Sequence, residues 1–181
     1  DCSVEKITEQ TAKLPFKDLY PDHMQSLPVE HRDDNAELSI HSWLVRTPGG
    51  VILIDTATGN GRERNHKPLF HQVNTPYYHR LIASGIDPAE VSLVLMTHIH
   101  TDHVGWNTHW VNGQWQPLFP SARYVCSAKE LEKCRTDPNQ KNLFNDSLLP
   151  LIASGQLDAI DISESPCFGN VLRYLPTPGH S

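Results

Sequence analysis

The sequence lacks any apolar run that approaches the roughly 18–20 consecutive residues a transmembrane helix needs. Basic residues are also scarce, because 15 Lys and Arg stand against 21 Asp and Glu, which gives a formal charge of -6. No basic stripe is visible, and proteins that bind nucleic acids electrostatically depend on such stripes. We therefore expect no membrane partner and no nucleic-acid partner.

Cysteine is rare, with four residues in 181, and no two of them form a C-x-x-C pair. A chain this long and this poor in cysteine does not need a disulfide framework. We expect reduced thiols and a cytoplasmic location. A periplasmic or secreted location stays open, because the sequence shows no leader peptide but does not begin with Met either.

The length of 181 residues is typical of one domain. A composition with 38% hydrophobic and 20% charged residues is ordinary for a globular protein. Residues 1–36 are polar and interrupted by prolines, which predicts an irregular N-terminal lead-in with short elements at most. Residues 37–181 are expected to form the folded domain.

Strand and helix patterns are mixed after residue 36. Apolar and polar residues alternate over 37–46, and an apolar run follows at 51–54 after a Pro-Gly-Gly turn, which predicts two neighbouring strands. The run at 91–96 predicts a central strand. Ser127 followed by Glu130 predicts a capping box at a helix start. We also expect helices at 77–84, 127–134 and 143–153, strands at 123–126, 157–162 and 170–175, and a loop at 106–122. This order indicates an α/β or α+β layered domain with its site at strand ends.

Histidine, by contrast, is abundant, with 11 residues. His98-x-His100-x-Asp102-His103 follows the predicted central strand directly. Side chains two residues apart in an extended segment point the same way, so His98 and His100 can bind one ion, while Asp102 and His103 can point to a second. Imidazole and carboxylate groups suit Zn²⁺ and other first-row metals. The alternatives are a solvated histidine loop and a structural zinc site, although structural zinc usually has several thiolate ligands.

Two further signals lie at other strand ends. His180, in Pro178-Gly179-His180, follows the strand predicted at 170–175 and is expected to be the third imidazole of the first ion. Asp55 follows the strand at 51–54. It is expected to accept hydrogen bonds that orient the loop containing His98–His103, which we call the metal loop, with a turn or cap role as the alternative.

The segments His98–His103, Asp55-Thr56 and Pro178–His180, in this order, resemble the metallo-β-lactamase superfamily. The resemblance covers roughly residues 37–181. It implies an α/β fold of the αββα sandwich type, with a metal site at one edge of its two sheets. It also implies that His98, His100 and His180 bind one zinc, and that Asp102 and His103 bind a second. Two Zn²⁺ per full-length chain are then expected, with iron or manganese as alternatives.

The sequence departs from the family pattern because it stops just after His180. The family's bridging Asp and its last metal-binding His lie further on. These residues are therefore expected to form only the N-terminal half to two-thirds of the sandwich, with the C-terminal part absent. Such a piece should bind the second ion poorly.

Two stretches look like the lactonase and organophosphate-hydrolase-like branch of the family: Gly85–Pro88 leading into the 91–98 segment, and Gly105–Asn107. The resemblance implies a hydrolase in which a metal-bound hydroxide attacks a small-molecule lactone or ester. Asp102 would also serve as a catalytic proton shuttle. Trp106 and Trp110 could form an apolar wall for the substrate, with packing in the core as the alternative. A homodimer stays open.

Other functions on the same fold compete with this hypothesis. They are a β-lactamase, a thioesterase like glyoxalase II and a persulfide dioxygenase, the last being favoured by a mononuclear iron. A non-catalytic metal-binding module is the alternative from a different class. It would bind zinc yet hydrolyse nothing across a panel of lactones, aryl esters, β-lactams and thioesters.

Overall fold

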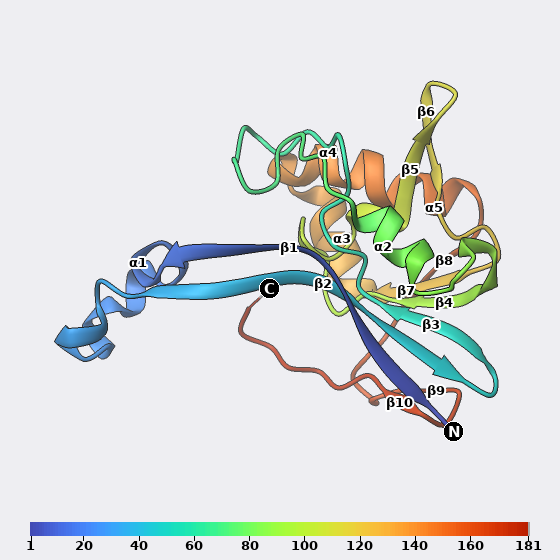
Figure 1. The fold of residues 1–181 in the computed structure, drawn as a ribbon, viewed down its shortest axis with the longest axis horizontal. Helices are drawn as coiled ribbons and strands as arrows, with labels where there is room; N and C mark the ends of the chain where they lie inside the picture. Colours follow the sequence, from blue (N-terminus) through green and yellow to red (C-terminus); the bar gives the residue numbers. More distant parts are fainter. Residues whose placement is uncertain (181) are drawn as a thin grey trace.

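A computed structural model describes residues 1–180, and a six-stranded sheet is its scaffold (Figure 1). The strand order is β1-β2-β3-β4-β7-β8. The first three strands pair antiparallel, and β3, β4, β7 and β8 run parallel. The bounds are β1 (Ser3–Pro15), β2 (Asn35–Thr47), β3 (Gly50–Ile54), β4 (Val91–Leu95), β7 (Arg123–Ser127) and β8 (Leu157–Ile160).

Two short hairpins and several helices complete the described chain. The hairpin strands are β5 (Thr108–Val111) with β6 (Gln114–Pro117), and β9 (Cys167–Phe168) with β10 (Leu172–Arg173). The α-helices are α1 (Phe16–Leu19), α2 (Tyr77–Ala83), α3 (Ala128–Thr136), α4 (Lys141–Leu143) and α5 (Leu149–Ala153). The 3₁₀ and π turns are η1 (Pro21–Ser26), η2 (Val29–His31), η3 (Pro88–Glu90), η4 (Gly105–Asn107), η5 (Pro138–Gln140) and η6 (Phe144–Leu148).

The sheet is covered by different elements on its two faces. On one face, sheet residues such as Leu53 and Val94 form the main core together with Leu81 of α2 and Leu151 of α5. On the other face, a smaller apolar cluster unites sheet residues with Phe168 of β9. Burial of both faces is typical of a parallel sheet between layers. The predicted α/β class is confirmed.

The prediction of an irregular lead-in is wrong for residues 3–15. These residues form β1, which pairs with β2 from Ser3 opposite Arg46 to Pro15 opposite Asn35. Ile7 is the one apolar side chain buried along β1 in the described structure. An edge strand held mainly by backbone hydrogen bonds carries almost no apolar periodicity, so the sequence pattern gave no signal. The domain boundary at residue 37 stays a prediction.

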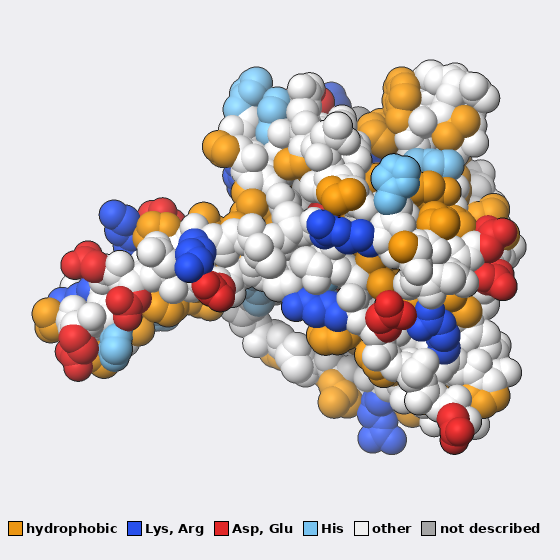
Figure 2. Space-filling model, viewed as in Figure 1, with side chains coloured by type: hydrophobic (Ala, Val, Ile, Leu, Met, Phe, Trp, Pro, Cys, Tyr) orange, Lys and Arg blue, Asp and Glu red, His pale blue; other side chains and the backbone are white. Residues whose placement is uncertain are grey.

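The far end of the β1–β2 pair carries α1, η1 and η2 and projects from the body of the protein as an arm (Figures 1 and 2). Most side chains from residue 16 to residue 35 are exposed. The arm stands apart from the strand ends that follow β3 and β4, where the predicted site residues lie.

Most other predicted elements are present. The strand predicted at 170–175 is limited to β10, and the loop predicted at 106–122 contains the β5–β6 hairpin. The capping box predicted at Ser127 is wrong, because no side chain caps α3. Glu130 instead turns to the loop after β4 and accepts a hydrogen bond from the Ile99 backbone N–H at 3.2 Å.

The four cysteines are free, and they fall into two environments. Cys126 and Cys134 are buried, and burial raises the pKa of each thiol to about 12. Cys2 and Cys167 are exposed.

None of the helices within residues 1–180 has the length and apolar character needed to cross a membrane.

Candidate metal centre

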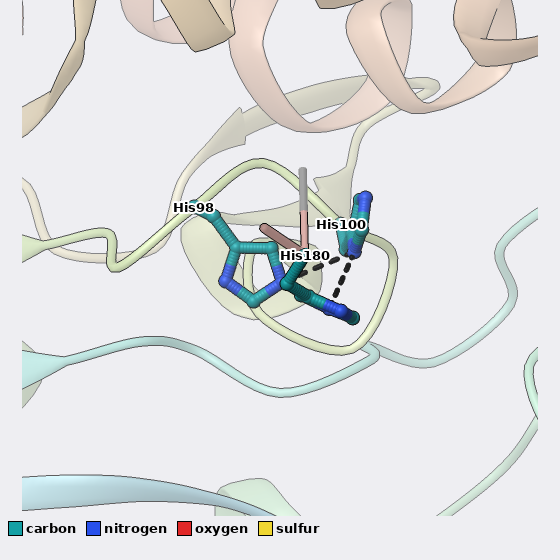
Figure 3. Close-up of side chains that lie close together, drawn as sticks. All are labelled: His98, His100 and His180. Atoms are coloured by element: carbon teal, nitrogen blue, oxygen red, sulfur yellow. Dashed lines mark hydrogen bonds between the residues drawn. The ribbon is translucent and has the colours of Figure 1, made fainter. Parts of the chain in front are cut away.

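Three imidazoles meet at the carboxyl end of the parallel strands (Figure 3). His98 and His100 lie in the loop after β4, and His180 comes from the far end of the chain. The His98 Nε2 atom lies 3.1 Å from His100 Nδ1, which in turn lies 3.2 Å from His180 Nε2. All three ligand-type atoms lie within 4.8 Å of one another.

Two of the three spacings between these nitrogens suit one tetrahedral cation. Zinc–nitrogen bonds of about 2.0–2.1 Å place neighbouring ligand nitrogens about 3.3 Å apart in a tetrahedron. The observed separations of 3.1 and 3.2 Å are close to that value. Three imidazoles with a fourth position left for water or substrate are typical of catalytic zinc, whereas structural zinc is usually closed by four protein ligands. The triad therefore fits the metal that the sequence predicts.

Burial and neighbouring imidazoles favour the neutral form of His98 and His100. Burial lowers the pKa of His98 to about 4, and the neighbouring His103 and His100 lower it further. Burial also lowers the pKa of His100, with His180 adding to the effect. A neutral imidazole offers a nitrogen lone pair, which is the form that binds a metal.

Asp102 and His103 lie beside the triad. The His103 Nε2 atom is 3.5 Å from an Asp102 carboxylate oxygen, and the ring centroids of His98 and His103 are 4.0 Å apart. Burial alone would lower the pKa of His103, but the hydrogen bond and charge of Asp55 and the charge of Asp102 raise it instead. Asp102 and His103 can face one cation together, with fewer ligands than the triad offers. Their role as a second metal site stays a prediction.

Asp55 connects β3 to the metal loop. One carboxylate oxygen accepts a hydrogen bond from the Thr97 backbone N–H at 2.7 Å. The other accepts from the Thr97 hydroxyl at 2.7 Å and lies 2.8 Å from His103 Nδ1. This contact to Nδ1 leaves Nε2 of His103 free for a metal, which is the usual arrangement around metal-binding histidines. Asp55 itself has a φ of 58°, a left-handed conformation that Asp tolerates better than most residues.

We expect Asp55→Asn to weaken the site without unfolding the protein. The amide keeps one acceptor oxygen, but its NH₂ group must face either Thr97 or His103. Changes to such orienting groups typically cost 10–100-fold in metal affinity or activity. Zinc affinity should therefore fall by about 10-fold or more, as measured by competition with a chelator. The matched control is Asp158→Asn, at a carboxylate on β8 that pairs with Arg123 away from the loop. Equal zinc affinity in both variants would contradict the role given to Asp55.

The end of the metal loop packs directly against the segment after β3. The Gly105 N–H donates to the Ala57 carbonyl at 2.7 Å, and the Thr56 N–H donates to the His103 carbonyl at 2.7 Å. A Cβ atom on Gly105 would lie 1.7 Å from the Thr58 carbonyl oxygen, so only glycine fits there. The two backbones therefore fix each other.

Next to Gly105 lies a buried network of charged side chains formed by Arg62, Arg64 and Asp146. Arg62 is 1% exposed, donates to the Gly105 and Thr108 carbonyls, and lies over the Trp115 ring at 3.7 Å. Arg64 binds both carboxylate oxygens of Asp146, at 2.7 and 2.9 Å. Breaking a buried, hydrogen-bonded pair is costly, so this network holds the 59–75 loop in place.

Two residues that support the loop were missed by the sequence analysis as site residues. Glu130 accepts the hydrogen bond from Ile99 described above. Tyr174 donates its hydroxyl to the Met96 carbonyl at 2.5 Å and also contacts the Thr97 carbonyl at 2.7 Å. Tyr174 thereby ties the segment that carries His180 to the loop that carries His98. Both contacts join residues far apart in sequence, and no local pattern reports them.

The two tryptophans proposed as a substrate wall lie elsewhere. Trp106 is 7% exposed and stacks on Tyr77 with ring centroids 5.4 Å apart. It therefore packs in the core, which was the alternative to a substrate wall. Trp110 is 59% exposed on β5 and meets Trp115 edge-on. Neither lines the cleft beside His100.

That cleft has a volume of about 350 Å³ and borders the histidine triad at His100. Its walls come from the 63–70 segment, the metal loop and the region from η5 to α4. The lining residues are Glu63, Arg64, Asn65, Lys67, Phe70, His100, Thr101, Asp102, Asn139, Gln140, Asn142 and Leu143. A cleft next to converging metal-ligand side chains is where a substrate of a metal-dependent enzyme would bind.

A family model described as the metallo-beta-lactamase superfamily matches residues 36–181. No curated protein matches. Among solved structures, a probable metal-dependent hydrolase from Staphylococcus aureus has a TM-score of 0.65 at 19% identity, covering 89% of this chain and 59% of that one.

Two further solved structures are similar. The hydrolase AbOPH of the beta lactamase superfamily has a TM-score of 0.60 at 20% identity, covering 90% of this chain and 59% of its own. AidC, a dizinc quorum-quenching lactonase in complex with the product N-hexnoyl-L-homoserine, has a TM-score of 0.62 at 16% identity, covering 94% and 61%. At these identities the likeness shows a shared fold. The chain spans about three-fifths of the length of these structures.

Proposed function

Because the chain belongs to the metallo-β-lactamase superfamily, we propose that it acts as a metal-dependent hydrolase on a lactone or another ester of a small molecule. The observation that carries the proposal is the meeting of His98, His100 and His180 at the edge of a cleft. Nothing in this arrangement requires a Ser or Cys nucleophile. Asp102 lines the same cleft, so a carboxylate is available where a substrate would bind.

Each residue of the site would have a distinct role in hydrolysis. His98, His100 and His180 would hold one cation, and Asp102 with His103 would contact a second. When bound, a divalent cation supplies a Lewis acid and lowers the pKa of water toward neutrality. Asp102 would accept a proton from the attacking water and pass it to the leaving oxygen. Asp55 would keep His103 oriented through its Nδ1 atom.

The cleft lining favours a small, polar substrate. Four carboxamides line it, at Asn65, Asn139, Gln140 and Asn142, while Phe70 and Leu143 add apolar surface. Arg64 is occupied by Asp146, so Lys67 is the lining cation that remains for a ligand within the described residues. Carboxamides bind amide, ester and hydroxyl groups. A lactone that carries an amide is therefore the first substrate class to test, and the open-chain product named for AidC carries such an amide.

The test combines metal counting with a substrate panel. The zinc-loaded protein is assayed against an N-acyl homoserine lactone, an aryl ester, a β-lactam and a thioester, and its metals are identified by elemental analysis. We expect turnover of the lactone or the aryl ester that disappears on chelation and returns with zinc. Zinc binding without turnover of any panel member would favour a non-catalytic module. Preferential retention of a single iron would favour the dioxygenase alternative.

A further inference from the structure

Glu9 is a buried carboxylate whose role the metal motifs do not explain. It lies on β1, outside the residues 36–181 that the family model matches, and it is 2% exposed. Within residues 1–180, no Lys, Arg or His forms an ion pair with it. A buried carboxylate that is not ion-paired is costly unless hydrogen bonds satisfy its oxygens.

Four donors satisfy Glu9. One oxygen accepts from the Thr58 backbone N–H at 2.7 Å. The other accepts from the Gly59 N–H at 3.2 Å, from the Thr75 hydroxyl at 3.1 Å and from the Trp106 indole N–H at 2.7 Å. Hydrogen bonds to a charged acceptor are roughly twice as strong as neutral ones.

The strand is irregular where Glu9 lies, which explains the direction of its side chain. Thr8 lies opposite His41 and Gln10 lies opposite Ile40, so Glu9 is an extra residue without a partner on β2. Such bulges bend a strand and re-aim a side chain. Arg80 of α2 holds the bulge by donating to the Thr8 and Glu9 carbonyls, at 2.6 and 3.0 Å.

Three of the four donors to Glu9 belong to the two segments that carry the metal site. Thr58 and Gly59 follow Asp55 along the chain, and Trp106 follows His103. The 55–59 and 103–107 segments are bonded to each other through Gly105 and Ala57 and through Thr56 and His103. Glu9 binds both segments at one end, and the contact between Asp55 and His103 lies at the other end.

We propose that Glu9 is a positioning residue that clamps the 55–59 and 103–107 segments together and so sets the orientation of His103 toward the metal. The N-terminal strand is then part of the metal centre rather than an appendage. This inference rests on the proposed metal site but not on the substrate. Its consequence is that metal geometry depends on a side chain that contacts no metal ligand directly.

The test replaces Glu9 and reads out the metal site in the full chain. Glu9→Gln keeps the shape of the side chain but turns an NH₂ group toward N–H donors. We expect cobalt and zinc affinities to fall by about 10-fold or more, the range found for groups that orient ligands. The absorption spectrum of the cobalt-loaded protein should change with them. The control is Glu5→Gln on the same strand, whose carboxylate pairs with Arg46 at the surface and should leave both readouts unchanged.

A second measurement does not depend on metal. Amide exchange at Thr58 and Gly59 in the metal-free protein should accelerate about 10-fold or more in Glu9→Gln, because both N–H groups lose a charged acceptor. Should Glu9→Gln fail to fold, Trp106→Phe decides, since it removes one donor and keeps a ring in place. It should shift the cobalt spectrum in the same direction.

The outcomes separate this inference from the hydrolase proposal. A folded Glu9→Gln protein with the cobalt spectrum, metal affinity and amide exchange of the parent would overturn it, and so would an unchanged spectrum in Trp106→Phe where Glu9→Gln does not fold. Altered metal geometry in a protein that turns over no ester would leave the positioning role standing and remove the proposed hydrolase activity.

Discussion

Replacing His100 with Ala should abolish metal binding at the triad and turnover with it. The His100 Nδ1 atom is the shared neighbour, 3.1 Å from His98 Nε2 and 3.2 Å from His180 Nε2. Without it only two protein ligands, His98 and His180, remain for the cation. Loss of groups that merely orient ligands costs 10–100-fold, so removing a ligand should lower zinc affinity and activity by more than about 100-fold.

The measurement pairs the two consequences in one protein. Zinc content after gel filtration and chelator competition report affinity, and the panel substrate with the highest rate reports activity. His79→Ala is the matched control, because His79 is an exposed histidine on α2 that does not belong to the group formed by His98, His100 and His180. Parental zinc content and turnover in His100→Ala would refute the assignment of the triad as the metal site.

The metal loop could be predicted because its chemistry is local in sequence. His98, His100, Asp102 and His103 lie within six residues after an apolar strand, and the alternation of side chains in an extended segment explains their spacing. Asp55 could be proposed because a carboxylate at a strand end reaches the neighbouring strand end in a parallel sheet. The Asp55 carboxylate accepts a hydrogen bond from the Thr97 N–H and contacts His103 Nδ1, both in the loop after β4.

The supports of the site could not be predicted, because they join distant residues. The hydrogen bond from Trp106 to Glu9 spans 97 positions, and that from Tyr174 to the Met96 carbonyl spans 78. No periodicity records such a contact. β1 was missed for a related reason, since an edge strand with one buried apolar residue, Ile7, has no apolar stripe and its bulge shifts the alternation at Glu9.

Replacing Gly105 with Ala should disrupt the fold around the site. The new Cβ would lie 1.7 Å from the Thr58 carbonyl oxygen, 1.9 Å from its carbon and 2.5 Å from the Gly59 nitrogen. All three are backbone atoms, and hydrogen bonds to Glu9 hold the 58–59 segment in place. Overpacking commonly costs 1–3 kcal/mol, and a clash with fixed backbone belongs at or above the top of that range. We expect the free energy of unfolding to fall by about 3 kcal/mol or more.

Urea unfolding measures this change, with Gly49→Ala as the control. The nearest atom to a Cβ at Gly49 is the Thr47 hydroxyl oxygen at 3.7 Å, which is ordinary contact. The control should therefore stay within about 0.5 kcal/mol of the parent. If Gly105→Ala folds at all, the 103–107 segment must move away from the 55–59 segment, so zinc affinity should fall along with stability. A Gly105→Ala protein with the parental urea midpoint would mean that the two backbones do not pack against each other, and the support given to the metal loop would fail with that contact.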